Sequence, residues 1–192
     1  LDFIDSGQGG SLSDAVEAVD YAIAAGANII NASWGGSACS SSLSKRILSL
    51  AEKNILFVNA SGNMGRNLDN FVEYPSGFNH PTQITVGATG ETDIMAHYSN
   101  YSSTIVSIFA PGTDIISTVP GNRYAYMSGT SMASPFAAGV AALIWSLKPD
   151  SKFSEIKDLI LNASQKNDSY LNVSKGRLDV GFIVEELLQG QP

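Results

Sequence analysis

Residues 129–135 read Gly-Thr-Ser-Met-Ala-Ser-Pro, and an Ala-rich apolar segment, 136–145, follows without a break. The apolar side chains recur at helical spacing, which places Ser131 at or beside a helix N-terminus. Free backbone N–H groups and the positive end of the helix dipole favour a negatively charged oxygen there. A nucleophilic serine needs such surroundings, because its attack on a carbonyl creates an oxyanion. A serine at this place is also typical of a plain helix cap, and both interpretations stay open on these residues alone.

Length and composition indicate one α/β domain with a substantial core. The chain has 192 residues, of which 44% are hydrophobic and 15% charged, with 18 glycines. Its formal net charge of −7 argues against nucleic acid and anionic membrane surfaces as partners. No apolar run approaches the roughly 18 residues that a membrane span requires. The single cysteine, Cys39, excludes an internal disulfide and is interpreted as an ordinary thiol, since nothing near it in sequence offers a base.

Helices and strands alternate along the first part of the chain. A helix capped by Ser11 or Ser13 precedes a short apolar strand at 27–32, and an amphipathic helix at 44–53 precedes a second strand at 55–60. Short links between such elements predict a parallel sheet covered by helices on both faces. Ligands meet such a sheet at the carboxyl ends of its strands. The segments that follow the two strands are therefore candidate site residues.

These two strand ends are rich in small and turn-forming residues. The first reads Ser-Trp-Gly-Gly at 33–36, and the second reads Ala-Ser-Gly-Asn-Met-Gly at 60–65. Glycine and asparagine tolerate left-handed backbone conformations, so each segment alone is typical of an ordinary strand-to-helix turn. The two segments together with the serine motif at 129–135 are a more specific indication of a functional site than either segment alone.

The segment 129–135 resembles the nucleophile motif of the subtilisin-like serine proteases, the subtilases. The resemblance assigns the nucleophile to Ser131 and not to Ser134. The elbow of the α/β-hydrolases, Gly-x-Ser-x-Gly, does not fit, because Ala133 stands where its second glycine belongs. Phe136 stands where many family members have histidine, and we expect it to pack rather than to take part in chemistry.

The two strand ends resemble the walls of the subtilase substrate cleft. The resemblance implies that one wall consists of Ser33, Trp34 and Gly35, and that the backbone of these residues pairs with the substrate strand. It implies that the other wall of the pocket consists of Ala60, Ser61 and Gly62. Asn63 matches the family asparagine that donates a hydrogen bond to the oxyanion.

A Tyr-Pro turn follows at 74–75, and the resemblance places the residue before it, Glu73, at the floor of the pocket for the side chain preceding the cleaved bond. A carboxylate there favours Lys or Arg, whereas a solvated loop carboxylate is the alternative. A Ser-Asn turn at 99–100, an Ala-Pro-Gly loop at 110–112 and a predicted hairpin at 114–126 also fit the family. The resemblance thus covers essentially the whole chain.

The family triad runs Asp, His, Ser along the chain, and only the serine has a match here. Residues 5–7 read Asp-Ser-Gly and imitate the aspartate motif, but they lie at the wrong place in the fold order. His80 and His97 lack the family's Gly-Thr-His context and are predicted to be exposed polar residues. Residues 1–4 read as the end of a strand. We therefore expect residues 1–192 to be a partial subtilase domain, three-layer α/β/α with a mostly parallel sheet, incomplete at the N-terminus, with the Asp and His motifs upstream of residue 1.

The resemblance implies a secreted serine endopeptidase that acts on protein or peptide substrates through an acyl-enzyme on Ser131. The fragment alone is expected to be inactive, with the missing N-terminal part of the domain as its partner. No cofactor is predicted, although a structural calcium ion is possible in the full-length protein by family resemblance. One alternative is a pseudoprotease or interaction domain with this fold. Another is a plain α/β binding module, disfavoured because no Gly-x-Gly-x-x-Gly follows the first strand.

Overall fold

The computed structural model describes residues 1, 4, 9–166, 168–170 and 175–189. The strands are β1 (Ile29–Ala32), β2 (Leu56–Ala60), β3 (Gln83–Thr89), β4 (Ile108–Pro111), β5 (Ile115–Val119) and β6 (Arg123–Met127). The helices are α1 (Leu12–Ala24), α2 (Ser41–Ser49), α3 (Thr130–Leu147), α4 (Phe153–Asn162) and α5 (Val180–Gln189), with 3-10 turns η1 (Leu50–Lys53), η2 (Ser76–Phe78) and η3 (Asp168–Tyr170). The Asp-Ser-Gly at 5–7 lies outside the described residues.

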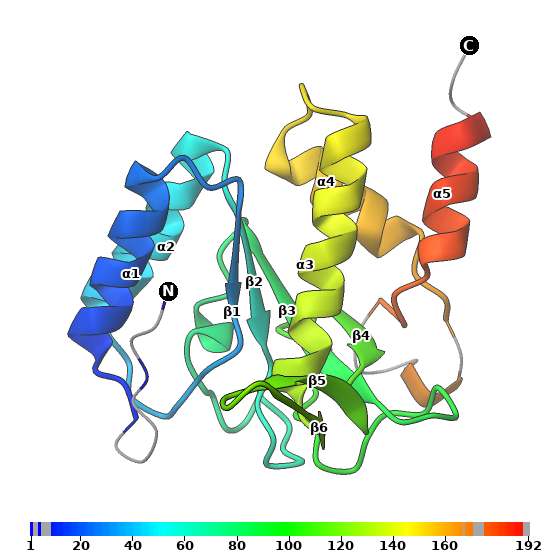
Figure 1. The fold of residues 1–192 in the computed structure, drawn as a ribbon, viewed down its shortest axis with the longest axis horizontal. Helices are drawn as coiled ribbons and strands as arrows, with labels where there is room; N and C mark the ends of the chain where they lie inside the picture. Colours follow the sequence, from blue (N-terminus) through cyan, green and yellow to red (C-terminus); the bar gives the residue numbers. More distant parts are fainter. Residues whose placement is uncertain (2–3, 5–8, 167, 171–174, 190–192) are drawn as a thin grey trace.

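Four parallel strands form the central sheet in the order β1-β2-β3-β4, and β5 and β6 form a separate antiparallel hairpin. Figure 1 shows α1 and α2 on one side of the sheet and α3 and α4 on the other. Alternate residues of β2 explain both layers, because successive strand side chains point to opposite faces. Leu56 and Val58 pack in the cluster of α3 and α4, whereas Phe57 packs in that of α1 and α2. The fold is therefore the predicted three-layer α/β/α arrangement.

Serine caps set the starts of the first two helices. Ser11 is the N-cap of α1, and its hydroxyl accepts a hydrogen bond from the backbone N–H of Asp14 at 3.1 Å. Ser40 caps α2 in the same way, so this helix begins three residues earlier than the sequence predicted. At the far end, Asn54 adopts a left-handed conformation and stops the 3-10 turn η1. Asn54 therefore marks the place where the chain turns into β2.

The long helix α3 is the one whose N-terminus carries Ser131. It is long and apolar enough to cross a membrane by length and composition, a property that the sequence analysis did not anticipate. Its side chains Ala137, Ala141 and Ile144 are fully buried against the sheet, so it packs as a core helix of this fold. Such helices pass the same compositional test as membrane spans.

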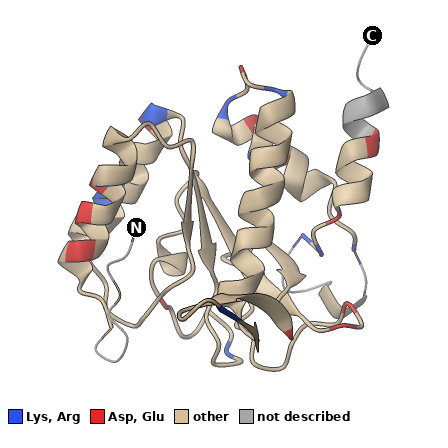
Figure 2. Ribbon diagram, viewed as in Figure 1, with Lys and Arg blue, Asp and Glu red and all other residues tan. Residues whose placement is uncertain are grey.

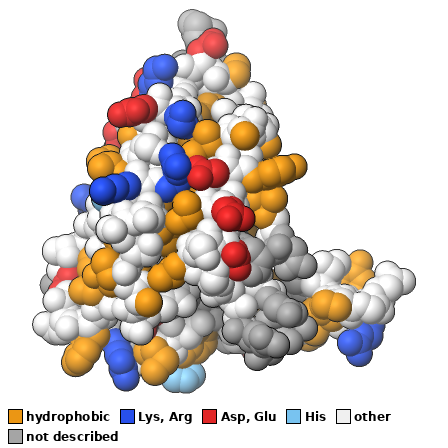
Figure 3. All heavy atoms as spheres, turned by 90° about the vertical axis from the view of Figure 1, so that its left-hand side faces the viewer, with side chains coloured by type: hydrophobic (Ala, Val, Ile, Leu, Met, Phe, Trp, Pro, Cys, Tyr) orange, Lys and Arg blue, Asp and Glu red, His pale blue; other side chains and the backbone are white. Residues whose placement is uncertain are grey.

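Charged residues lie mainly on the outer helices and in the loops (Figure 2). On the side of the molecule that faces the viewer in Figure 3, acidic and basic side chains are interspersed with apolar ones. This face therefore carries no large patch of a single sign.

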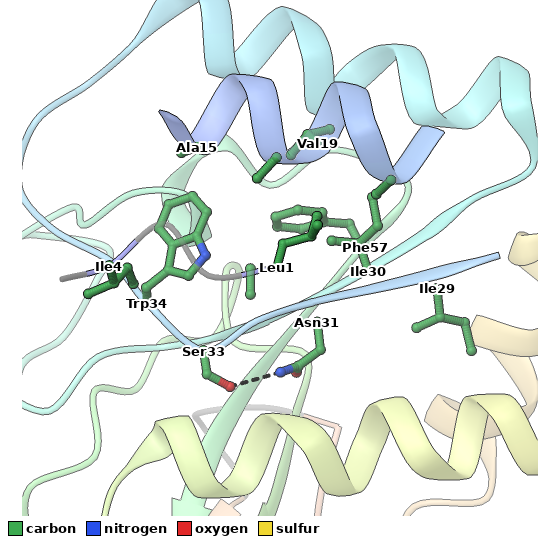
Figure 4. Close-up of a pocket in the computed structure, with 13 residues that line it drawn as sticks. Leu1, Ile4, Ala15, Val19, Ile29, Ile30, Asn31, Ser33, Trp34 and Phe57 are labelled. Atoms are coloured by element: carbon green, nitrogen blue, oxygen red, sulfur yellow. Dashed lines mark hydrogen bonds between the residues drawn. The ribbon is translucent and has the colours of Figure 1, made fainter. Parts of the chain in front are cut away.

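Strand β1 forms one edge of the sheet, and no strand pairs with its outer side among the residues that the structure describes. A cleft of about 430 Å³ runs along this edge under α1, lined by apolar side chains that include Leu1, Ile30 and Phe57 (Figure 4). The strand reads Ile-Ile-Asn-Ala and carries none of the charges or prolines that protect natural edges. This edge is therefore open to pairing with another strand.

We expect the chain alone to self-associate through β1 at micromolar concentration, because pairing covers both the open backbone groups and the apolar cleft. Light scattering measures this directly. Asn31→Lys, which adds a charge to an exposed side chain of β1, is expected to yield monomers. A compact, stable monomer of the unmodified chain at the same concentration contradicts the expectation.

Candidate active site

Ser131 lies in the first turn of α3, directly after Thr130, with Gly129 at the N-cap position. The hydroxyl of Ser131 makes no capping bond; it donates instead to the backbone carbonyl of Ser33 at 2.9 Å. The interpretation of Ser131 as a plain helix cap is therefore wrong. The backbone N–H groups of Thr130, Met132 and Ala133 already have acceptors in the described structure, whereas that of Ser131 has none, so the first turn is suitably placed for oxyanion chemistry.

A set of short hydrogen bonds ties the end of β1 to the start of α3. The Ser33 hydroxyl donates to the backbone carbonyl of Ser131 at 2.9 Å and lies 2.8 Å from the Ser134 hydroxyl. The side-chain amide of Asn31 donates to the same Ser33 hydroxyl at 2.9 Å. Ser33 thus contributes by holding the serine turn, and Ser134 packs fully buried behind it.

Asn63 reaches the same helix start from the end of β2. Its Oδ1 accepts from the backbone N–H of Thr130 at 2.8 Å and from the Thr130 hydroxyl at 2.9 Å. A backbone N–H can only donate, so the oxygen of the carboxamide must face Thr130 and the nitrogen must face away from it. The Thr130 hydroxyl also accepts from the backbone N–H of Gly62 at 3.1 Å. Thr130, which the sequence analysis did not single out, therefore orients the Asn63 amide.

One cavity of about 360 Å³ collects the predicted site residues. Its lining includes every predicted position except Ser33, namely Trp34, Gly35, Ala60, Ser61, Gly62, Asn63, Glu73 and Ser131. The wall that follows β1 is joined to the segment of Glu73 where Gly36 and Tyr74 exchange backbone hydrogen bonds of 2.9 and 2.8 Å. The parallel strand ends and the helix start thus meet in one place, as the sheet topology requires.

Glu73 lies half-buried at this cavity, immediately before Tyr74. A methyl group on Gly62 would overlap both the Glu73 carboxylate and the side-chain amide of Asn100. Glycine is therefore required at 62, where the backbone also has a φ of +101°. No ion pair engages Glu73 within the described ranges of the chain, whose salt bridges are Asp20–Arg46 and Asp93–Arg177.

Neither His80 nor His97 forms a hydrogen bond with Ser131 in the described structure. The Nε2 of His80 lies 3.0 Å from the hydroxyl of Ser44 in α2, and burial lowers the pKa of this imidazole. The prediction that His80 is exposed is therefore wrong, whereas His97 is exposed as predicted. Among the described residues, no group of three or more His, Cys, Asp or Glu side chains is placed to hold a metal ion.

Fold and cleft together define a subtilisin-like α/β protein. The sequence model of the Subtilase family matches residues 1–177, and the chain belongs to that family. It is 43% identical over 141 residues to a thermophilic serine proteinase of Bacillus sp. (strain AK1), a match that covers 73% of this chain and 34% of the relative. Over 207 residues it is 33% identical to subtilisin-like protease 2 of Plasmodium falciparum, covering 99% of this chain and 15% of the relative. The chain thus spans about a third or less of the length of these relatives.

Solved structures show the same likeness. The protease domain of PatA superposes with a TM-score of 0.83 at 27% identity, covering 97% of this chain and 69% of that chain. The prenylagaramide maturation protease PagA gives the same TM-score at 29% identity, covering 96% of this chain and 71% of its own. Both similar folds therefore contain a portion that this chain does not match.

Proposed function

We propose that this chain supplies the nucleophile and the oxyanion-binding half of a serine endopeptidase site. The observation that carries the proposal is the meeting of the Ser131 hydroxyl, the Asn63 amide and two backbone walls at one cavity. Ser131 attacks the substrate carbonyl and forms an acyl-enzyme, which water then hydrolyses. The developing oxyanion accepts hydrogen bonds from the Asn63 side chain and from the backbone N–H of Ser131 at the start of α3.

The general base and its orienting carboxylate belong, in this proposal, to another part of the full-length protein. Within the described structure the Ser131 hydroxyl donates to a backbone carbonyl and not to a base. The open edge of β1 and its apolar cleft are where that other part can add to the sheet. We propose protein or peptide substrates and, from family resemblance, an extracellular location, which fractionation of the producing cells tests.

A fluorophosphonate probe tests the proposal, because it bonds covalently to an activated serine with loss of fluoride. We expect rapid, stoichiometric labelling at Ser131 in the full-length protein and slow or no labelling of this chain alone, where no base activates the hydroxyl. Peptide mapping identifies the labelled residue. Rapid labelling of the chain alone would mean that it contains its own base, and an unreactive full-length protein would indicate a pseudoprotease.

Glu73 is proposed to select the side chain that precedes the cleaved bond. Its carboxylate borders Gly62 in the cavity and has no basic partner among the described residues, so a Lys or Arg side chain of the substrate can pair with it. A charge-assisted hydrogen bond of about 1.5–3 kcal/mol corresponds to roughly 10- to 150-fold in preference. Acidic side chains are disfavoured there by like-charge repulsion.

Glu73→Gln in the full-length protein is therefore expected to lower the Lys/Arg-to-Leu cleavage ratio by about that factor, 10- to 150-fold. Cleavage of a peptide library measures the ratio, and kcat/KM for the Leu substrate is the internal control, which should change little. If the ratio is the same in the variant, Glu73 is a solvated loop carboxylate and the pocket assignment is wrong.

A further inference from the structure

The loop that carries Asn63 wraps around one fully buried side chain, that of Asn100. The loop leaves β2 and turns through two glycines with left-handed backbones, Gly62 at φ +101° and Gly65 at φ +62°. Asn100 lies in the Ser-Asn turn between β3 and β4 and is 0% exposed. Asn100 is therefore distant in sequence from the loop that carries Asn63, although its side chain is buried in the middle of that loop.

The carboxamide of Asn100 uses both of its ends on the loop backbone. Its Oδ1 accepts from the backbone N–H groups of Met64 at 3.1 Å and Arg66 at 3.0 Å. Its Nδ2 donates to the backbone carbonyl of Ser61 at 3.0 Å. The backbone of Asn100 adds a bond from its own N–H to the Gly62 carbonyl at 2.9 Å. Asn100 thus bonds to the backbone of residues on both sides of Asn63 but not to Asn63 itself, whose side chain faces the active-site cavity.

These contacts decide where the Asn63 amide lies. Asn63 is exposed, and its Oδ1 accepts hydrogen bonds from the backbone N–H and the hydroxyl of Thr130. These bonds orient the amide but do not fix the backbone from which it projects. The hydrogen bonds to Asn100 fix that backbone, because a buried carboxamide with satisfied donors and acceptors is costly to displace. A displacement of about 1 Å at a reacting group can cost roughly 100-fold in rate.

We propose that Asn100 is the positioning residue for the oxyanion donor Asn63. The inference rests on the proposed function, in which Asn63 donates to the oxyanion. Asn100 touches no substrate in this scheme; it acts through the loop. The distal end of the same loop offers a matched control, since Asp69 accepts hydrogen bonds of 2.6 Å from both Ser102 and Thr104 and anchors the loop away from the cavity.

Kinetics of the full-length protein on a peptide amide test the proposal. Asn100→Ala is expected to lower kcat by roughly 10- to 100-fold with KM nearly unchanged, since the lost interaction is made in the transition state. In an Asn63→Ala background the same substitution should change kcat by no more than about twofold, because the donor it positions is already absent. Asp69→Ala is expected to leave kcat near wild type in either background.

Amide hydrogen exchange of the full-length protein gives a readout independent of activity. The N–H groups of Met64 and Arg66 are expected to exchange faster in Asn100→Ala and to stay protected in Asp69→Ala. If Asn100→Ala does not fold, Asn100→Asp keeps the acceptor oxygens for Met64 and Arg66 but loses the donor to Ser61, and the kinetic cycle with Asn63→Ala applies to it, whereas the exchange readout belongs to Asn100→Ala. Equal losses in both backgrounds, an unchanged kcat, or unchanged protection of Met64 and Arg66 would each overturn the assignment. Absence of any Ser131-dependent hydrolysis would instead remove the proposed function, while exchange still decides whether Asn100 holds the loop.

Discussion

Ser131→Ala in the full-length protein is expected to abolish peptide hydrolysis with little loss of stability. Removal of the nucleophile costs on the order of 10⁶-fold in kcat, a size measured for subtilisin and taken over from that relative. The hydroxyl does not cap α3, and in the described structure it donates to the Ser33 carbonyl. The free energy of unfolding should therefore fall by only about 0.5–1.5 kcal/mol. Residual hydrolysis above the water rate can remain from the oxyanion site and substrate binding.

Ser134→Ala is the matched control for this variant, because Ser134 lies one turn further along α3 and bonds to the Ser33 hydroxyl. It removes a buried hydroxyl of the same helix without removing the proposed nucleophile. Initial rates on a peptide substrate and thermal unfolding of both variants show which of the two serines is the nucleophile. If Ser131→Ala keeps wild-type rates while Ser134→Ala is inactive, the assignment of the nucleophile is wrong.

Local sequence patterns predicted the layers of the fold but not the exact ends of its elements. Apolar runs at 27–32 and 55–60 predicted strands β1 and β2, since a strand covered on both faces is apolar throughout. Strand β2 is fully buried as expected, whereas the expectation of a fully buried strand was wrong for β1, an edge strand whose Asn31 is exposed. The start of a helix depends on a single cap residue. Because Ser40 caps α2, this helix begins earlier than its apolar periodicity alone indicated. The hairpin around residues 120–122 was predicted because Pro-Gly-Asn is a local turn signal that needs no distant partner.

In the candidate site, too, some residues could be predicted from local patterns and others could not. Residues of the two strand ends and the serine turn were predicted because short motifs carry them, and the structure brings them to one cavity. Thr130 and Asn100 act through hydrogen bonds to partners 34 to 68 positions away, so no local pattern reveals their roles. His80 was predicted to be exposed because its partner, Ser44, is distant in the same way. Contacts between segments, rather than composition, define how this site is held.

Asn63→Ala should produce the second large loss, in kcat rather than in KM. The amide nitrogen faces away from Thr130, so the variant removes a donor that meets the substrate oxygen only when that oxygen becomes negative. The expected decrease is about 10²–10³-fold, or roughly 2.7–4 kcal/mol, a figure known for the corresponding asparagine of subtilisin and carried over from it. Steady-state kinetics on a peptide amide measure kcat and KM separately.

Two further variants separate oxyanion binding from general disturbance of the loop. Met64→Ala changes the next residue, whose side chain is 58% exposed and lines the same cavity, and should leave kcat nearly unchanged. Asn63→Asp keeps the acceptor for Thr130 but replaces the donor with a charged oxygen that repels the oxyanion, so its loss should be at least as large as that of alanine. A variant that raises KM while kcat stays at the wild-type value would show that Asn63 contacts the substrate equally before and during the reaction. In that case the amide belongs to substrate binding, and the backbone N–H of Ser131 must stabilise the oxyanion without it.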